Sequence, residues 1–206
     1  MIYHLITGTL TISILHALIP SHWLPILAFE KKFNWSRNQT LRITIIAALA
    51  HALSTVIVGI AIGFLSLKIN DSFRLITNLL VSAILLLLGL IFIIRHHRHN
   101  HFHLHNENEL QKLSSRKIIT VLVTSMFLSP CLEIEGYFIL AGTAGLSYIF
   151  LISLLYIVIS VIGIASWILF AQKIMKRINA HKIEHNAGLI SGVILIITGI
   201  VNFFLH

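Results

Sequence analysis

The sequence predicts an all-α integral membrane protein with six transmembrane helices. Hydrophobic residues make up 57% of the 206 residues and charged residues only 11%, so there are too few charges to cover the surface of a soluble domain. Apolar runs of about 20 residues, the length of a helix that crosses a bilayer, recur along the whole chain. We therefore expect lipid, rather than water, to surround most of this protein.

Six apolar runs are separated by shorter polar segments. In chain order they cover residues 6–29, 43–67, 75–94, 118–141, 148–171 and 187–205. A helix is the expected conformation of each run, because only internal hydrogen bonds can satisfy its backbone inside lipid. The first run lacks the basic start and the small-residue cleavage site of a signal peptide, so we expect it to be kept as the first span.

Lys and Arg residues predict the orientation of the chain. The first, third and fifth loops with their flanks contain 13 of the 15 basic residues, and the second loop contains the other two. Basic residues accumulate on the cytosolic side of membrane proteins. We therefore expect a multi-pass protein of the plasma or inner membrane, with both termini outside and the polar segment 95–117 in the cytosol. The net charge of +8 reflects these loops and does not indicate a nucleic-acid partner.

The two halves of the chain are predicted to be inverted repeats. Pro20 in the first span corresponds to Pro130 in the fourth, and Gly89 in the third corresponds to Gly199 in the sixth, both at a separation of 110 residues. Three spans per half would invert the second copy, as in many secondary transporters. Chance matching among apolar residues is the alternative. The predicted parts are a first three-helix repeat, 1–94, a cytosolic histidine-rich loop, 95–117, and a second three-helix repeat, 118–206.

The first span carries two histidines on either side of a proline, in the sequence HALIPSHWLP from His16 to Pro25. Pro20 cannot donate to the carbonyl of His16, and Pro25 likewise frees a carbonyl, so we expect a broken helix. On an unbroken helix the imidazoles of His16 and His22 would point about 120° apart, whereas a break lets them converge. Polar groups inside membranes mark transport pathways, so we predict that both histidines bind a metal ion. Hydrogen bonding to a neighbouring helix is the alternative.

His51, in the second span, is the third candidate nitrogen ligand. Ser54 and Thr55 follow it by three and four residues, so all three lie on one face of the helix. Imidazole suits zinc, copper, iron and nickel, and a third histidine would complete a nitrogen-rich site. A hydrogen-bonded core histidine is the alternative.

The fourth span combines a proline with two carboxylates, in the sequence SPCLEIEG from Ser129 to Gly136. An acidic side chain at the centre of a span costs roughly 3 kcal/mol, so Glu133 and Glu135 each need a partner, a proton or a cation. We predict that both line the metal site, with structural pairing as the alternative. Cys131 is a further candidate ligand, although a lone buried cysteine more often serves as a small hydrophobic residue.

The polar segment between the third and fourth spans is rich in histidine. Its histidines are His96, His97, His99, His101, His103 and His105. Their alternation gives no fixed ligand geometry, so we predict a flexible, low-affinity collector of metal ions. A weakly basic linker is the alternative.

The fifth span has a stripe of small and polar residues at three- and four-residue spacing: Ser153, Tyr156, Ser160 and Gly163. Such stripes pack helices together in membranes. We expect a structural role for these residues.

These motifs resemble those of the nickel/cobalt transporter group, which includes the nickel and cobalt efflux proteins and lies within a broader superfamily of six-span exporters. The segment from His16 to His22 is similar to the first-span histidine signature of that group. His51, with the hydroxyl residues that follow it, looks like the second-span motif. The loop histidines are similar to the group's histidine-rich insert, and Pro130-Cys131 resembles its proline-cysteine element.

The chain departs from that group at two positions. Efflux members commonly carry an acidic residue where this chain has Ile19 and a glycine where it has Ser21. We expect Glu133 and Glu135, from the opposite repeat, to supply the missing negative charge.

The sequence as a whole predicts a transporter of divalent transition-metal ions, with nickel or cobalt first and zinc next, and with export favoured. The ion is the substrate, and we expect no prosthetic group and no enzymatic activity. An exporter of amino acids or other small organic solutes with the same fold is the first alternative. An intramembrane metalloenzyme is the second, although no span has two histidines four apart beside a glutamate. The expected partners are metal ions and the lipid bilayer, and assembly into a homo-oligomer is left open.

Overall fold

The computed structural model describes residues 2–67, 74–98, 115–131, 133–175 and 186–205. In chain order its helices are α1 (Ile2–Ala17), α2 (Pro20–Phe33), α3 (Arg37–Ser66), α4 (Arg74–Arg98), α6 (Ser115–Phe127), α7 (Glu135–Ala144), α8 (Leu146–Met175) and α10 (Ala187–Leu205). The described residues contain no strand, which confirms the prediction of an all-α protein for this part of the chain.

Among the described residues, the structure confirms helices that are long and apolar enough to cross a membrane, but fewer of them than the six predicted spans. Three helical segments are long and apolar enough to cross a membrane: Ile2–Phe33, Arg37–Ser66 and Leu146–Lys173. Shorter apolar helices cover Ser82–Ile91 in α4 and Leu189–Val201 in α10. Many large Leu, Ile and Phe side chains are exposed on the outside of the bundle, where lipid would solvate them. The six-span count stays a prediction.

The first apolar segment is broken between α1 and α2, at the proline that begins α2. The sequence predicts a free carbonyl at His16, and this is wrong, because the N–H of Ile19 donates to that carbonyl over 3.1 Å in a tighter turn. The indole Nε1 of Trp23 donates to the carbonyl of Leu18 at 3.1 Å. The break is therefore closed by local hydrogen bonds, and α2 then continues through Pro25.

A second break separates α6 from α7 and contains Pro130. Two residues of α3, one helical turn apart, hold this segment. The hydroxyl Oγ1 of Thr55 accepts the backbone N–H of Cys131 at 3.1 Å, and Nδ1 of His51 donates to the carbonyl of Met126 at 3.1 Å. The polar face predicted on the second span thus supports the break in the fourth.

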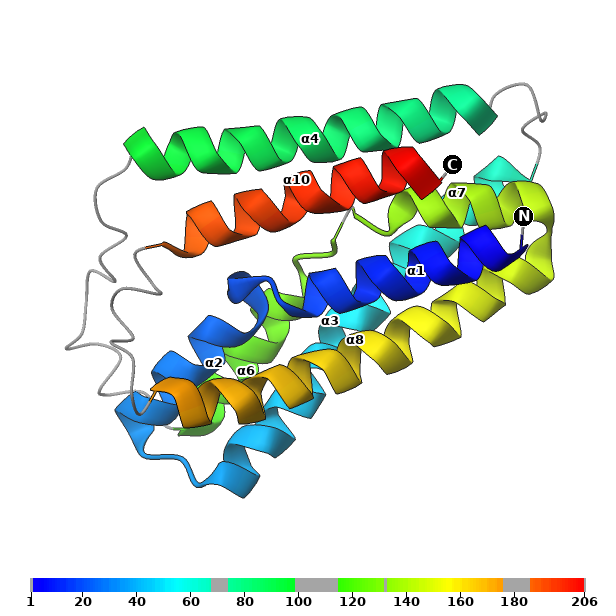
Figure 1. Ribbon diagram of the computed structural model, residues 1–206. Coiled ribbons are helices and arrows are strands. Elements are labelled where there is room, and N and C mark those ends of the chain that lie inside the picture. Colours follow the sequence, from blue (N-terminus) through cyan, green and yellow to red (C-terminus); the bar gives the residue numbers. More distant parts are fainter. Residues whose placement is uncertain (1, 68–73, 99–114, 132, 176–185, 206) are drawn as a thin grey trace.

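The long helices α3 and α8 pack against each other, with α1 on α8 and with α6 and α7 on α3. Helices α4 and α10 lie side by side as a separate pair along one side of the bundle (Figure 1). Gly89 and Gly192 bring these two helices close together, since a Cβ atom on either glycine would lie 2.7 Å from the carbonyl oxygen of the other.

Basic residues gather where α2 and α8 end. The last turn of α2 contains Lys31 and Lys32, and the last turn of α8 contains Lys173. A hydrogen bond from Nε2 of Gln172 to Oε1 of Glu30, 2.8 Å long, joins the two helix ends. These positive charges therefore lie at one end of the bundle, opposite the end that carries the N- and C-termini (Figure 1).

Glycines allow α7 to pack closely against α1 and α3. A side chain at Gly8 of α1 would overlap the ring of Tyr137. A side chain at Gly142 of α7 would overlap the hydroxyl of Ser66 and the carbonyl of Gly63 on α3. The position of α7, and of the break before it, therefore depends on the absence of side chains at these contacts.

Replacing Gly142 by alanine should destabilise the protein by about 1–3 kcal/mol, because the added methyl group must push α7 away from the backbone of α3. Denaturant unfolding of the purified protein in detergent, followed by tryptophan fluorescence, measures this loss. Ser147→Ala, at an exposed position nearby, is the control and should leave stability unchanged. Equal stability of the two variants would contradict the tight α3–α7 contact.

Candidate metal centre

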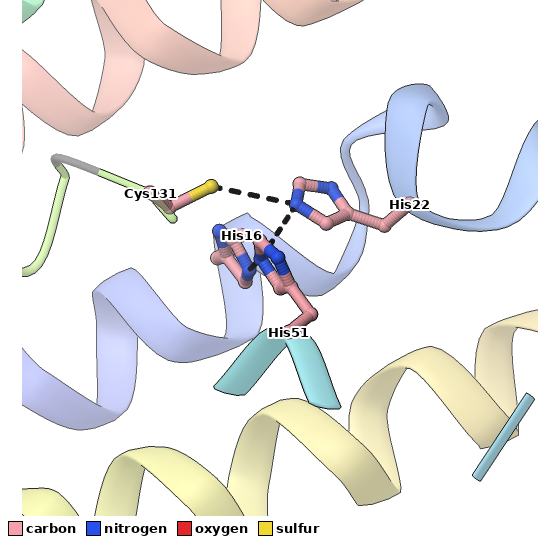
Figure 2. Close-up of side chains that lie close together, drawn as sticks. All are labelled: His16, His22, His51 and Cys131. Atoms are coloured by element: carbon pink, nitrogen blue, oxygen red, sulfur yellow. Dashed lines mark hydrogen bonds between the residues drawn. The ribbon is translucent and has the colours of Figure 1, made fainter. Parts of the chain in front are cut away.

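Three buried histidines converge at the first helix break (Figure 2). His16 ends α1, His22 lies in the first turn of α2, and His51 lies near the middle of α3. Their side chains are almost fully buried, with residue exposures of 1%, 5% and 2%. Nε2 of His51 lies 3.1 Å from Nε2 of His22 and 3.2 Å from Nε2 of His16. The break predicted from Pro20 thus brings together the two imidazoles that a continuous helix would separate.

Each imidazole is oriented through its other nitrogen, Nδ1. Nδ1 of His22 donates to the carbonyl of Ile19 at 3.3 Å, and Nδ1 of His51 donates to the carbonyl of Met126 at 3.1 Å. Nδ1 of His16 lies 3.3 Å from the carboxylate Oε2 of Glu133. Histidines that bind metals typically donate their second ring N–H to a carbonyl or a carboxylate in this way.

This hydrogen bonding determines what the three Nε2 atoms can do. A carbonyl oxygen only accepts, so the Nδ1 atoms of His22 and His51 carry the hydrogen, and a neutral imidazole then has only a lone pair at Nε2. The two Nε2 lone pairs face each other across 3.1 Å without a hydrogen between them. Facing lone pairs repel, whereas a cation bound between them turns the contact into coordination. The arrangement is therefore suited to a positive ion.

Cys131 supplies a fourth ligand atom from the break between α6 and α7. Its Sγ lies 3.5 Å from Nε2 of His22, and its backbone N–H is held by Thr55 of α3. From the sequence alone this cysteine is a weaker candidate than the histidines, because a lone buried cysteine is usually a small hydrophobic residue. Only the approach of the break between α6 and α7 to α2 and α3 places the thiol beside the imidazoles.

Three of the six separations among the four candidate ligand atoms are close to those of a tetrahedral site. Nitrogen ligands at about 2.0–2.1 Å and a sulfur ligand at about 2.3 Å would lie roughly 3.3–3.6 Å from one another around a zinc-like ion. The separations of 3.1, 3.2 and 3.5 Å are close to these values, and all four atoms lie within 4.8 Å of one another. Three nitrogens and one sulfur can therefore close around one ion with small side-chain movements.

The two predicted glutamates do not join this set of four. Glu133 is buried but contacts the outer nitrogen of His16, so it supports a candidate ligand instead of converging with the four ligand atoms. Glu135, in the first turn of α7, is also buried, and neither of its carboxylate oxygens has a hydrogen-bond partner among the described residues. Glu133 therefore orients a candidate ligand and is not one of the four ligand atoms. Glu135 has no hydrogen bond that would link it to the site among the described residues.

Tyr156 of α8 also lies at the site, although its place in a stripe of small and polar residues predicts a role in helix packing. It is fully buried, and its hydroxyl lies 3.3 Å from Nε2 of His16. Its ring lies 5.6 Å from the His16 ring, so it also limits the movement of that imidazole. A tyrosine among serines in a span is the only sequence signal for this role, since a buried phenol needs a polar partner.

The predicted metal-collecting loop lies mainly outside the described residues. Helix α4 ends at Arg98 and α6 begins at Ser115, which leaves four of the six loop histidines beyond the described part of the chain. The side chains of the other two, His96 and His97, are also outside it. The collector therefore stays a prediction.

No family model matches the chain, and neither the comparison with curated proteins nor the comparison with solved structures finds a match. The resemblance to the nickel/cobalt transporter group stays a prediction based on short motifs.

A cobalt titration should detect one tetrahedral site per chain. We expect Co²⁺ to give intense visible bands and a sulfur-to-cobalt charge-transfer band, measured on purified protein in which the six loop histidines are changed to serine. Cys131→Ser should remove the charge-transfer band, and His51→Ala should weaken binding by at least about 10-fold, because each removes one ligand atom. His4→Ala, at an exposed histidine of α1, is the control. A spectrum of hydrated cobalt with the parent protein would contradict the site.

Proposed function

We propose that this protein transports divalent transition-metal ions across a membrane, and that His16, His22, His51 and Cys131 bind the ion on its way. The observation that carries the proposal is the convergence of three Nε2 atoms, 3.1 and 3.2 Å apart, inside a bundle of apolar helices, with facing lone pairs on His22 and His51. A cation is the ligand that satisfies such a set. A buried site in the bilayer, away from both aqueous phases, is where a transporter holds its substrate.

The position of the ligands at two helix breaks supports transport over a purely structural metal site. His16 and His22 flank the first break, and Cys131 lies in the second. In transporters, broken helices near the middle of the membrane form the substrate site, and rocking of the two repeats exposes it to alternate sides. We propose that residues 1–94 and 118–206 are such inverted repeats and that the chain crosses the membrane six times.

The rival functions account for less of the site. An exporter of amino acids or other organic solutes would explain the breaks but not three imidazole nitrogens that face one another. A metalloenzyme would need an open coordination position for water or substrate, whereas Cys131 would take the fourth position of a tetrahedral ion at this site. Transport of a metal ion uses both the breaks and the ligands.

The donor atoms also bear on which ion is carried. Three imidazoles and one thiolate in a tetrahedral arrangement suit zinc and cobalt(II), whereas nickel(II) more often adopts square-planar or tetragonal geometry. We therefore propose cobalt and zinc ahead of nickel, which the resemblance alone ranks beside cobalt. The predicted cytosolic collector favours export, because it would gather ions on the side from which they leave.

The proposed topology can be checked by cysteine labelling in intact cells. In a Cys131→Ser background, a membrane-impermeant maleimide should label His206→Cys at the C-terminus and should not label His101→Cys in the histidine-rich loop until the membrane is permeabilised. This result follows from the basic loops, which are expected to face the cytosol. The reverse pattern would overturn the proposed orientation.

Transport itself can be measured in sealed vesicles of known orientation. We expect the parent protein to move radioactive cobalt or zinc, and His16→Ala, His22→Ala and Cys131→Ala each to reduce the rate by at least about 10-fold, because each removes one ligand from the path. The sign of the flux gives the direction.

The exposed-site variant His4→Ala is the matched control, since it also removes one histidine from α1. Radioactive amino acids test the rival function in the same vesicles. Movement of no metal ion by well-folded protein would refute the proposal, and movement of an amino acid would replace it with the exporter of organic solutes.

A further inference from the structure

Glu133 differs from the other groups that orient the histidines. His22 and His51 donate to backbone carbonyls, which are neutral, whereas His16 faces a carboxylate. Glu133 is 6% exposed, and its Oε2 lies 3.3 Å from Nδ1 of His16, on the side of the ring that points away from the other ligands. It therefore adds a negative charge next to the site without being one of the four ligand atoms.

This charge matters because the site is buried. With neutral imidazoles, the charges closest to a bound ion would be those of the Cys131 thiolate and of the Glu133 carboxylate, which contacts the ring of His16 directly. A divalent ion balances two negative charges, whereas a monovalent ion leaves one uncompensated. An uncompensated buried charge is costly, because neither water nor a counter-ion screens it.

We infer that Glu133 is a positioning residue that makes the site select divalent over monovalent ions, by holding His16 through Nδ1 and by supplying the second negative charge. The inference rests on the metal site of the proposed function. Soft monovalent ions such as Cu⁺ and Ag⁺ would otherwise compete, since sulfur and imidazole bind them well.

The test is equilibrium binding of Co²⁺ and of Ag⁺ to purified full-length protein that lacks the six loop histidines. Glu133→Gln keeps an oxygen that can accept the Nδ1–H of His16 but removes the charge. We expect this variant to lose about 10–100-fold in Co²⁺ affinity, the usual effect of losing an outer-shell partner, and far less in Ag⁺ affinity. The cobalt spectrum should stay tetrahedral, because the four ligands are unchanged.

Glu135→Gln is the matched control. It makes the same substitution two residues away, at a carboxylate that is equally buried and has no hydrogen bond to a ligand among the described residues. The ratio of Co²⁺ to Ag⁺ affinity should change clearly less in this variant than in Glu133→Gln, because Glu135 has no hydrogen bond to a ligand. A conservative variant, Glu133→Asp, keeps the charge and should retain more of the parent ratio than Glu133→Gln.

Three results would overturn the inference: an equal loss of both ions in Glu133→Gln, an unchanged Co²⁺ affinity, or an equal change of the ratio in Glu135→Gln. A cobalt spectrum that changes coordination in Glu133→Gln would show that Glu133 is itself a ligand and would also overturn it. If Glu133→Gln does not fold, the Glu133→Asp variant is the test. A ratio of Co²⁺ to Ag⁺ affinity well below that of the parent protein would then count against the inference.

Binding and transport fail in distinguishable ways. Parent protein that binds neither ion would remove the metal site, and with it both the proposed function and this inference. Parent protein that binds Co²⁺ but moves no ion in vesicles would refute transport alone, and the comparison of Glu133→Gln with Glu135→Gln would still test the selectivity.

Discussion

The Nε2 atoms of His16, His22 and His51 face one another at 3.1 and 3.2 Å inside an apolar bundle, and each is held there by a hydrogen bond at Nδ1. The neutral imidazoles of His22 and His51 present facing lone pairs in this arrangement, and these repel unless a cation lies between them. The packing of the bundle must therefore hold these groups together against their repulsion. As a result, the site is already formed before an ion binds. Preorganisation of this kind increases affinity, because binding does not have to pay for ordering the ligands.

The backbone breaks make this arrangement compatible with a helical membrane protein. Inside lipid an irregular backbone is tolerated only where its polar groups find partners. The first break is satisfied locally by Ile19 and Trp23, and the second by Thr55 and His51 of α3. His51 thus has two tasks, since its Nδ1 holds the second break and its Nε2 faces the first. One residue couples the two halves of the chain through the site itself.

The two halves of the chain contribute different chemical groups to the site. The first half supplies three nitrogens, and the second supplies the sulfur of Cys131, the carboxylate of Glu133 and the hydroxyl of Tyr156. Any movement of one half against the other would change the distances between nitrogen and sulfur, and so the affinity for the ion. Under the proposed function, a site divided in this way would bind the ion in one arrangement of the halves and release it in another. The glycine contacts of α7 with α1 and α3 show how closely the halves pack in the arrangement described here.

The sequence by itself determined the helical class, the membrane character and the two breaks, because these depend on composition, on run length and on the missing N–H of proline. It also identified the three histidines, since imidazole inside an apolar run needs a polar reason to be there. Only the tertiary structure decided how these residues meet. Which nitrogen of each ring points inward, the position of Glu133 behind His16, and the entry of Cys131 and Tyr156 all depend on contacts between helices that are 29 to 140 residues apart in sequence. Such contacts are set by the packing of whole helices, and the spacing of residues within a single span carries no record of them.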